Sequence, residues 1–526
     1  MTSERKGILQ AAGVLASATI LSRVMGMVRD MVTSRLFGAG MATDAFFAAF
    51  QIPNMLRRFF AEGALTAAFV PTFSETLVQD GEEQARELAN LCFTLLTIVV
   101  AMITLLGVLF SPLIIRLMFP GFMAVDGKFE LTVLLNRVMF PYLLLISLVA
   151  LCMGILNTLR HFFTPAISTV FLNITMILAA LLLRSFFQYP ITALAVGVLL
   201  GGLLQLLLQL PVLWRRGFQL RFRLGWKSNP KVRKIALLML PATLGVGVYY
   251  LNITVGNILA SLLPQGSVSY LYYAQRLFEF PQGVFTVSVA QAVLPAMSRQ
   301  AAEGDLAAMK DSLNYGVRLT LFVTIPAMAG LIVCAKPLMA LIFMGGQFDF
   351  GMARQSASAL IYYSLGLSCV ALVRVLAPAF YALKDTKTPV FTAFVSFLLN
   401  LGFSLWLMGP LKHGGLALAS SLSALGNMLL LFLLLRRKVG LLGGRRLLRT
   451  ALVSACASLP MAAAVWWLIS LLDWSQPGMK LVKAGYVATS VGVAVMVYSL
   501  FTHLMHSEET AEFRGLIARK LRRSKA

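Results

Sequence analysis

The chain has 526 residues, of which 59% are hydrophobic and only 13% are charged, and its formal net charge is +24. Soluble domains carry about 25% charged residues, so the composition excludes an ordinary soluble protein and indicates a membrane protein. The basic residues lie in short clusters between apolar runs, which is the pattern of cytoplasmic loops and argues against a nucleic-acid partner.

Apolar windows of about 20 residues predict the membrane-spanning helices. The first window, after Arg5 and Lys6, also suits a signal peptide, but no small-residue cleavage site follows and the helical pattern continues. We therefore expect an all-α polytopic protein with fourteen transmembrane helices, at approximately 8–36, 42–77, 91–118, 133–158, 164–186, 191–214, 235–263, 268–298, 314–343, 356–382, 388–409, 414–435, 449–472 and 481–505. The first, second and eighth are longer than a bilayer requires and carry charges, which predicts tilted or bent helices lining a cavity.

The loops predict the orientation. Clusters of Lys and Arg lie between the sixth and seventh spans, between the twelfth and thirteenth, and after the fourteenth. All three fall on one side of the membrane, which the positive-inside rule makes cytoplasmic. Loops of the other face, such as 263–266, are nearly without Lys or Arg. Both termini are therefore expected in the cytoplasm.

An internal repeat predicts the domain organisation. At an offset of 224 residues, Leu159, Arg160, Thr164 and Pro165 match Leu383, Lys384, Thr388 and Pro389. Each repeat holds six spans, so both run in the same direction, as in transporters with two parallel lobes around a central cavity. We expect lobes at 1–224 and 225–440, and two extra C-terminal helices with a basic tail at 441–526. The small residues Ala484, Ala488 and Gly492 predict a face of the last span suited to close helix packing.

The first two spans contain an unusual set of ionisable residues. Each costs at least ~2.5–3.5 kcal/mol at membrane depth. They are Arg23, Arg29, Asp30, Asp44, Arg57, Arg58 and Glu62. Because arginines outnumber acids, we interpret the set as part of a polar cavity for an anion. The alternative is local neutralisation, with Arg23 or Arg29 paired to Asp30, Asp44 or Glu62, and Arg57 or Arg58 paired to Glu62.

The second lobe adds further charges. Arg276 and Glu279 lie at i, i+3 on one helix face, so they belong to a cavity or form a self-contained ion pair. Arg374, in the tenth span, is a candidate for the cavity or for a lobe interface. The planar guanidinium group makes two charge-assisted hydrogen bonds to a phosphate, so several converging arginines suit a diphosphate.

Signals for catalysis or cofactors are absent from the sequence. No Walker A motif is present, and a glycosyltransferase or phosphatase would need a cluster of acids or histidines at a membrane face. His503 and His506 have the spacing of metal ligands but are interpreted as solvated histidines. We therefore expect a transporter rather than an enzyme, with no cofactor and no assigned metal site.

Three stretches resemble the signature of the MurJ (MviN) lipid II flippase family. They are SRVMGMVRDMVTSRLFGAGMATDAFFAAFQIPNMLRRFFAEGALTAAFVP (22–71), GSVSYLYYAQRLFEFPQGVF (266–285) and APAFYALKDTKTPV (377–390). The family belongs to the multidrug/oligosaccharidyl-lipid/polysaccharide exporter superfamily, with two six-helix lobes around a cationic cavity and two extra helices forming a groove for the undecaprenyl chain. The resemblance implies cavity arginines at Arg23, Arg29, Arg57 and Arg276, a functional acid at Asp44 and a cavity-lining residue at Ser269. Gln275 departs from relatives that carry an acid there.

The resemblance implies a function. We expect a lipid II flippase of the bacterial inner membrane that works by alternating access and couples to the membrane potential or to a cation. Its expected partners are lipid II, membrane lipids and the cell-wall synthesis machinery, and the expected state is monomeric. Two alternatives remain: a flippase for another polyprenyl-diphosphate saccharide, and a drug or cation antiporter, which would use acids to bind its substrates.

Overall fold

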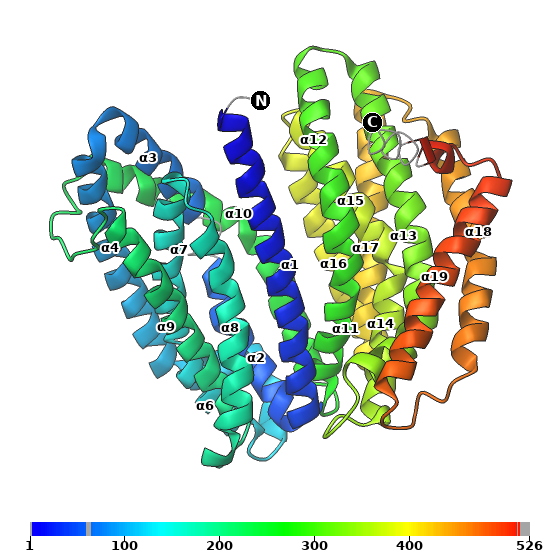
Figure 1. Ribbon diagram of the computed structural model, residues 1–526, viewed down its shortest axis with the longest axis horizontal. Coiled ribbons are helices and arrows are strands. Elements are labelled where there is room, and N and C mark those ends of the chain that lie inside the picture. Colours follow the sequence, from blue (N-terminus) through cyan, green and yellow to red (C-terminus); the bar gives the residue numbers. More distant parts are fainter. Residues whose placement is uncertain (1–2, 59–64, 513, 516–526) are drawn as a thin grey trace. The chain divides into compact units, whose positions relative to one another are not determined.

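The computed structural model describes residues 3–58, 65–512 and 514–515, and in them the chain forms helices and turns without a β-strand (Figure 1). The chain folds into two compact units, residues 1–268 and 269–526. Within the described residues, nine helices are long and apolar enough to cross a membrane, or ten when the bent pair α14 and α15 is taken as one span.

The first unit contains ten α-helices among its described residues. They are α1 (Ser3–Phe37), α2 (Met41–Arg57), α3 (Leu65–Gln79), α4 (Gly81–Leu109), α5 (Ser111–Met118), α6 (Lys128–Met139), α7 (Tyr142–Thr158), α8 (Phe163–Leu182), α9 (Thr192–Arg215) and α10 (Pro230–Ser261). Helices α8 and α9 run side by side, and α1 packs along α8. A cluster of buried side chains, including Phe69, Phe73 and Phe119, forms the core between α3, α4, α5 and α7.

The second unit begins within α11 (Ser267–Pro281), which a π-helical turn, Gln282–Thr286, connects to α12 (Val287–Ala302). It continues with α13 (Leu306–Ile342), α14 (Phe350–Leu365), α15 (Leu367–Ala382), α16 (Lys387–Leu411), α17 (His413–Val439), α18 (Gly444–Ser470) and α19 (Lys480–Leu504). Helix α13 packs against α12, α14, α15, α18 and α19. The π-helical turn interrupts the eighth predicted span, and such insertions are a known cause of helix bending. That this span is tilted or bent and lines a cavity stays a prediction.

Side-chain caps and proline fix several helix starts. Asp349 accepts a hydrogen bond from the backbone N–H of Met352 at 2.7 Å, and Asp305 accepts one from Ala308 at 2.9 Å. Asn229 caps α10 directly before Pro230, whose fixed φ suits the first helical position. These short polar residues satisfy N–H groups that have no partner inside the helix.

The turn between α7 and α8 recurs between α15 and α16 at the offset of 224 residues. Arg160 has φ of 58° and Lys384 has φ of 59°, although neither is glycine. The N–H of His161 donates to Leu156 O at 2.8 Å, and the N–H of Asp385 donates to Phe380 O at 2.8 Å. The sequence repeat therefore corresponds to a repeated backbone conformation at the helix ends.

Helix α10 belongs to the first compact unit. It packs against α3, α4 and α5, and the N–H of Gly121 donates to Ser261 Oγ at 3.2 Å. A Cβ at Gly121 would lie 2.1 Å from the Ser261 carbonyl oxygen, so only glycine permits this approach. The lobe boundary expected near residue 224 was inferred from the sequence repeat. The packing of α10 does not test a division between repeats, so that boundary stays a prediction.

Candidate functional site

Arg29 is buried between α1 and α8. Its side chain donates to Asp30 Oδ1 from Nε at 3.0 Å and from Nη2 at 2.7 Å. Its Nη1 donates to Asn173 Oδ1 at 3.1 Å. Residues Arg29 and Asp30 are 7% and 2% exposed. The local ion pair with Asp30, given above as an alternative, is therefore present, and Asn173 orients the other side of the guanidinium group.

Arg23 and Arg57 lie in more accessible positions of the first unit. Arg23 is exposed on α1 and forms no ion pair within the part of the chain that the structure describes. Arg57, half-buried at the end of α2, donates from Nε to Asn54 Oδ1 at 3.1 Å. Arg58 is exposed. Glu62, the acid expected to pair with one of these two residues, lies outside the described residues.

Asp44 is buried in the first turn of α2, where the helix dipole favours a negative charge. Its Oδ2 accepts hydrogen bonds from Lys128 Nζ at 2.9 Å and from the N–H of Gly266 at 2.8 Å. The ammonium group of Lys128 also lies 4.1 Å from the ring centroid of Phe122. Asp44 therefore connects α2, the start of α6 and the loop after α10.

Lys128 and Asn173 were missed by the sequence analysis. Lys128 is the single lysine between Lys6 and Lys227, and it precedes a predicted span on the face expected to lack positive charge. Such an isolated lysine beside a membrane span is a signal for a buried ion pair. Asn173 carries no comparable signal, because an amide in an apolar helix is compatible with many roles.

In the second unit, Arg276 lies on α11 beside aromatic and acidic neighbours. Its Nη2 donates to the Tyr272 hydroxyl oxygen at 2.8 Å, and its guanidinium carbon lies 4.9 Å from the centre of that ring. Its Nη1 is 3.8 Å from Glu279 Oε2, and the two side chains are 37% and 50% exposed. Gln275 donates to the other Glu279 oxygen at 3.1 Å. The ion pair expected from the i, i+3 spacing is thus long and accessible to solvent, and such pairs contribute little stability.

The remaining candidates of the second unit lie apart from this group. Ser269 is fully buried near the start of α11, whereas Arg374 is exposed on α15. No group of three or more metal-binding side chains occurs in the described residues. Of the candidate arginines, Arg29, Arg57 and Arg276 are oriented by side-chain hydrogen bonds, and Arg29 is in addition paired with Asp30. A guanidinium group can bind phosphate oxygens by charge-assisted hydrogen bonds.

Comparisons with known proteins identify the family. A family model described as lipid II flippase MurJ matches residues 33–484. A Vibrio cholerae protein named probable lipid II flippase MurJ is 39% identical over 509 residues, which cover 94% of this chain and 95% of the relative. A Burkholderia cenocepacia protein named lipid II flippase MurJ is 34% identical over 498 residues, which cover 94% and 96%.

Solved structures agree with the sequence comparison. Lipid II flippase MurJ in an inward closed conformation has a TM-score of 0.77 and 26% identity, covering 96% of this chain and 99% of that chain. An inward-facing transporter of the MATE family has a TM-score of 0.66 and 15% identity, covering 82% and 98%, which shows likeness of fold alone. On these matches, the chain belongs to the MurJ family of lipid II flippases.

Proposed function

We propose that this protein is a lipid II flippase, which moves the undecaprenyl-diphosphate-linked peptidoglycan precursor from the cytoplasmic to the periplasmic leaflet for cell-wall synthesis. The observation that carries the proposal is the family match over residues 33–484, together with relatives that are aligned over almost their whole length. The protein acts as a transporter and catalyses no bond-breaking step.

The arginines provide the physical mechanism of this proposal. An isolated anion moved into hydrocarbon carries an idealised cost of tens of kcal/mol, because it loses its hydration. Guanidinium groups of Arg29, Arg57 and Arg276, with Arg23 nearby, replace water around the diphosphate. Asn173 and Tyr272 support this role, since they orient Arg29 and Arg276 before a substrate binds. Asp44, Ser269, Asp30, Glu62, Glu279 and Arg374 complete the proposed cavity and its gates.

The proposed architecture has fourteen spans, with two parallel six-helix lobes that alternately open to each face of the inner membrane and both termini in the cytoplasm. Two extra helices, α18 and α19, form a groove for the lipid tail. Outward movement of negative charge is favoured by the membrane potential by ~2.3 kcal/mol per charge per 100 mV. We therefore propose coupling to that potential or to a cation, in a monomer that associates with the cell-wall synthesis machinery.

Depletion of the protein tests this function. Lipid II is expected to accumulate on the cytoplasmic side of the inner membrane, measured by its protection from an externally added lipid II-cleaving enzyme. Arg276→Ala, and Arg29→Ala combined with Asp30→Asn so that no buried carboxylate loses its partner, are expected to insert normally but not to restore transport. Arg436→Ala, which removes an exposed arginine at the end of α17, serves as the matched control and is expected to restore it.

The outcomes separate the alternatives. Normal lipid II turnover with accumulation of another polyprenyl-linked saccharide would indicate a flippase for that saccharide. Altered drug efflux with normal lipid II would indicate an antiporter. Full transport by both arginine variants would contradict the assignment of the diphosphate site while leaving the flippase function intact.

A further inference from the structure

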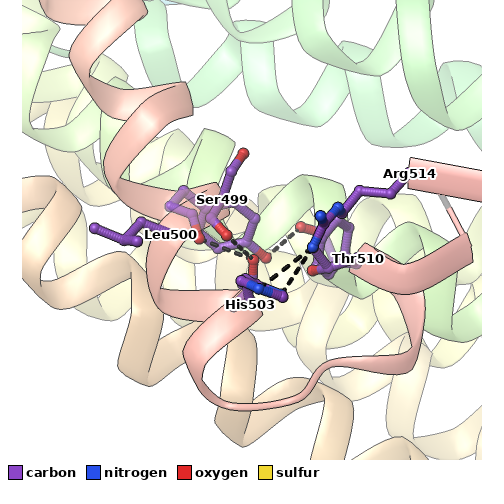
Figure 2. Close-up of a pocket in the computed structure, with 8 residues that line it drawn as sticks. Ser499, Leu500, His503, Thr510 and Arg514 are labelled. Atoms are coloured by element: carbon purple, nitrogen blue, oxygen red, sulfur yellow. Dashed lines mark hydrogen bonds between the residues drawn. The ribbon is translucent and has the colours of Figure 1, made fainter. Parts of the chain in front are cut away.

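A pocket of about 510 Å³ lies where α19 ends and the chain turns back toward α13 (Figure 2). Phe322 of α13 and Tyr498 and Leu500 of α19 contribute its apolar wall. His503, Thr510 and Arg514 contribute its polar side, and Figure 2 shows His503 and Arg514 facing each other. The pocket thus joins an apolar surface of a membrane span to a cationic group beyond its end.

The positive charge of Arg514 is not neutralised by a carboxylate within the described residues. Its Nη1 lies 3.2 Å from Nδ1 and 3.3 Å from Nε2 of His503, so the guanidinium group rests against the imidazole ring. Both side chains are exposed. The imidazole fixes the position of this cation without cancelling its charge.

The three acids of the same segment share one guanidinium group, that of Arg318. Arg318 on α13 forms ion pairs with Glu508 at 2.5 Å, with Glu509 at 3.2 Å and with Glu512 at 3.6 Å. Glu509 also accepts hydrogen bonds from Thr450 at 2.8 Å and from Ser507 at 2.7 Å. These contacts hold the segment 507–512 against α13 and α18, and so place Thr510 and Arg514 at the pocket.

Thr510, which also lines the pocket, supplies a second polar group. It is 8% exposed, and its hydroxyl oxygen has no hydrogen-bond partner among the described residues. A buried hydroxyl without a partner costs free energy, and a ligand with acceptor oxygens removes that cost. The unsatisfied hydroxyl is an observation independent of the charge on Arg514.

The apolar wall combines a buried aromatic pair with an exposed leucine. The Tyr498 hydroxyl donates to the Phe322 carbonyl oxygen at 2.7 Å, and the two rings are 5.3 Å apart. Leu500, one turn before the end of α19, is 53% exposed. A ligand here would contact Arg514 and Thr510 at one end and the exposed side chain of Leu500 at the other.

We propose that this pocket binds the headgroup of an anionic phospholipid, with Arg514 and the Thr510 hydroxyl donating hydrogen bonds to the phosphate. The acyl chain follows Phe322 and Leu500 along α19. The guanidinium group of Arg514 identifies this occupant, because it makes no ion pair within the described residues and lies beyond the end of a membrane span, where lipid phosphates are found. The inference does not depend on the proposed transport function.

Native mass spectrometry of the full-length protein with added phosphatidylglycerol tests the proposal. Arg514→Gln is expected to weaken phosphatidylglycerol retention roughly tenfold, as expected for loss of one charge-assisted hydrogen bond. Thr510→Val, which keeps the side-chain shape, is expected to weaken it severalfold. Arg445→Gln removes an exposed charge at the start of α18 and is the matched control, with retention expected to equal that of the unmodified protein.

Thermal unfolding of each variant verifies that it is folded. Equal retention by Arg514→Gln and Arg445→Gln would overturn the proposal, as would equal retention of phosphatidylcholine and phosphatidylglycerol by the unmodified protein. Displacement of the lipid by inorganic phosphate would identify a soluble anion as the ligand and would also overturn it. Competition by an uncharged polyprenol without any effect of Arg514→Gln would assign the pocket to a lipid tail instead.

Discussion

Two ion pairs of the first unit differ in burial and therefore in energetic importance. Asp44 and Lys128 have side chains that are 1% and 3% exposed, whereas Glu75 and Lys234 are 49% and 54% exposed. Removing one partner of a buried pair leaves an uncompensated charge and costs about 3–5 kcal/mol, whereas an exposed pair contributes about 0–1 kcal/mol. Lys128→Met is therefore expected to destabilise the protein strongly, and Lys234→Met only slightly.

Denaturant unfolding of the purified protein measures this difference. Asp44→Asn combined with Lys128→Met removes both charges, so the double variant is expected to be more stable than Lys128→Met alone. The introduced asparagine would still accept the hydrogen bond from the N–H of Gly266, because its side chain keeps one carbonyl oxygen. A cost for Lys128→Met no larger than that for Lys234→Met would show that Asp44 does not depend on this lysine.

At the residue scale, the sequence predicted which side chains carry unusual charges but not which neighbours orient them. Arg29 was identified because a charged side chain at membrane depth is energetically costly and therefore marks a candidate functional residue. Its contact with Asn173 depends on how α1 packs against α8, and no local pattern encodes that packing. The family resemblance implied a functional acid at Asp44, and its buried partner Lys128 became apparent only from the fold.

At the element scale, the repeated turn between α7 and α8 and between α15 and α16 makes a symmetrical prediction. A non-glycine residue in the left-handed region costs roughly 1–2 kcal/mol, and glycine avoids that cost at some loss of chain entropy. Arg160→Gly and Lys384→Gly are therefore each expected to stabilise the protein by up to about 1 kcal/mol. Glu87→Gly, at an exposed position inside α4, is expected to destabilise it by about 1 kcal/mol.

Unfolding midpoints of the three variants check this expectation. Effects of opposite sign at positions 160 and 384 would show that the two turns are not energetically equivalent, despite their matching φ values. The comparison thus tests whether the sequence repeat preserves the energetics of the turn as well as its shape.

The turn between α15 and α16 contains Asp385, whose contribution to stability depends on pH. Asp385 accepts hydrogen bonds from Lys438 Nζ at 2.7 Å and from the hydroxyl and N–H of Thr388 at 2.8 and 3.0 Å. The bond from Lys438, followed by those from Thr388, holds the pKa of Asp385 below its usual value of 3.8. A carboxyl group whose pKa is lowered by folding stabilises the folded state at pH values above its usual pKa. This stabilisation is lost as the pH falls through the lowered pKa.

Asp385→Asn is therefore expected to be less stable than the unmodified protein by a constant amount between about pH 5 and 8. The difference is expected to shrink only below the usual pKa of the carboxyl group. Lys438→Met removes the principal hydrogen bond and is expected to reproduce much of the loss, whereas Lys387→Met removes a nearby charge but not that bond. Thermal unfolding across this range measures the effect, and a difference that changes between pH 6 and 8 would assign it to another group.

One prediction about an element is wrong. Ala484, Ala488 and Gly492 were expected to form the packing face of the last span, but all three are exposed, and nothing lies within 4 Å of a Cβ built at Gly492. Helix α19 instead packs through larger residues, including Tyr486, Val487 and Tyr498. Small residues permit close approach but do not require it, so spacing alone could not determine which face is buried.

For the whole molecule, hydropathy predicted the all-helical fold because a bilayer requires long apolar helices whose backbone groups are all paired. Of the fourteen predicted spans, nine or ten correspond to helices of the described residues that are long and apolar enough to cross a membrane, so the count of fourteen stays a prediction. Hydropathy could not predict that α10 packs with the first unit, because its contacts join helices distant in sequence. Residues 42–77 were predicted to form one span. Helices α2 and α3 cover its two ends, with Pro53 and Pro71 inside them, and residues 59–64 between them lie outside the described residues, so the prediction of one span is not tested.

The orientation of the whole chain follows from the distribution of charge over its loops. The loop after α9 contains Arg216, Arg221, Arg223 and Lys227, whereas the loops at 262–266 and 471–479 contain no Lys or Arg. Basic loops stay in the cytoplasm, so we predict that single cysteines at Lys227 and Arg445 face the cytoplasm and those at Gln265 and Ser475 face the periplasm. All four residues are exposed, so a reagent can reach them.

Labelling of full-length variants with a membrane-impermeant thiol reagent distinguishes the two sides. In a Cys456→Ser background, which removes the exposed native thiol, Gln265→Cys and Ser475→Cys are expected to react in intact cells, and Lys227→Cys and Arg445→Cys only after lysis. Because α18 and α19 form a helical hairpin, Arg445 and Ser475 must lie on opposite sides if both helices span the membrane. Equal labelling of these two positions in intact cells would exclude α18 as a span, and with it the even count of spans that places both termini in the cytoplasm.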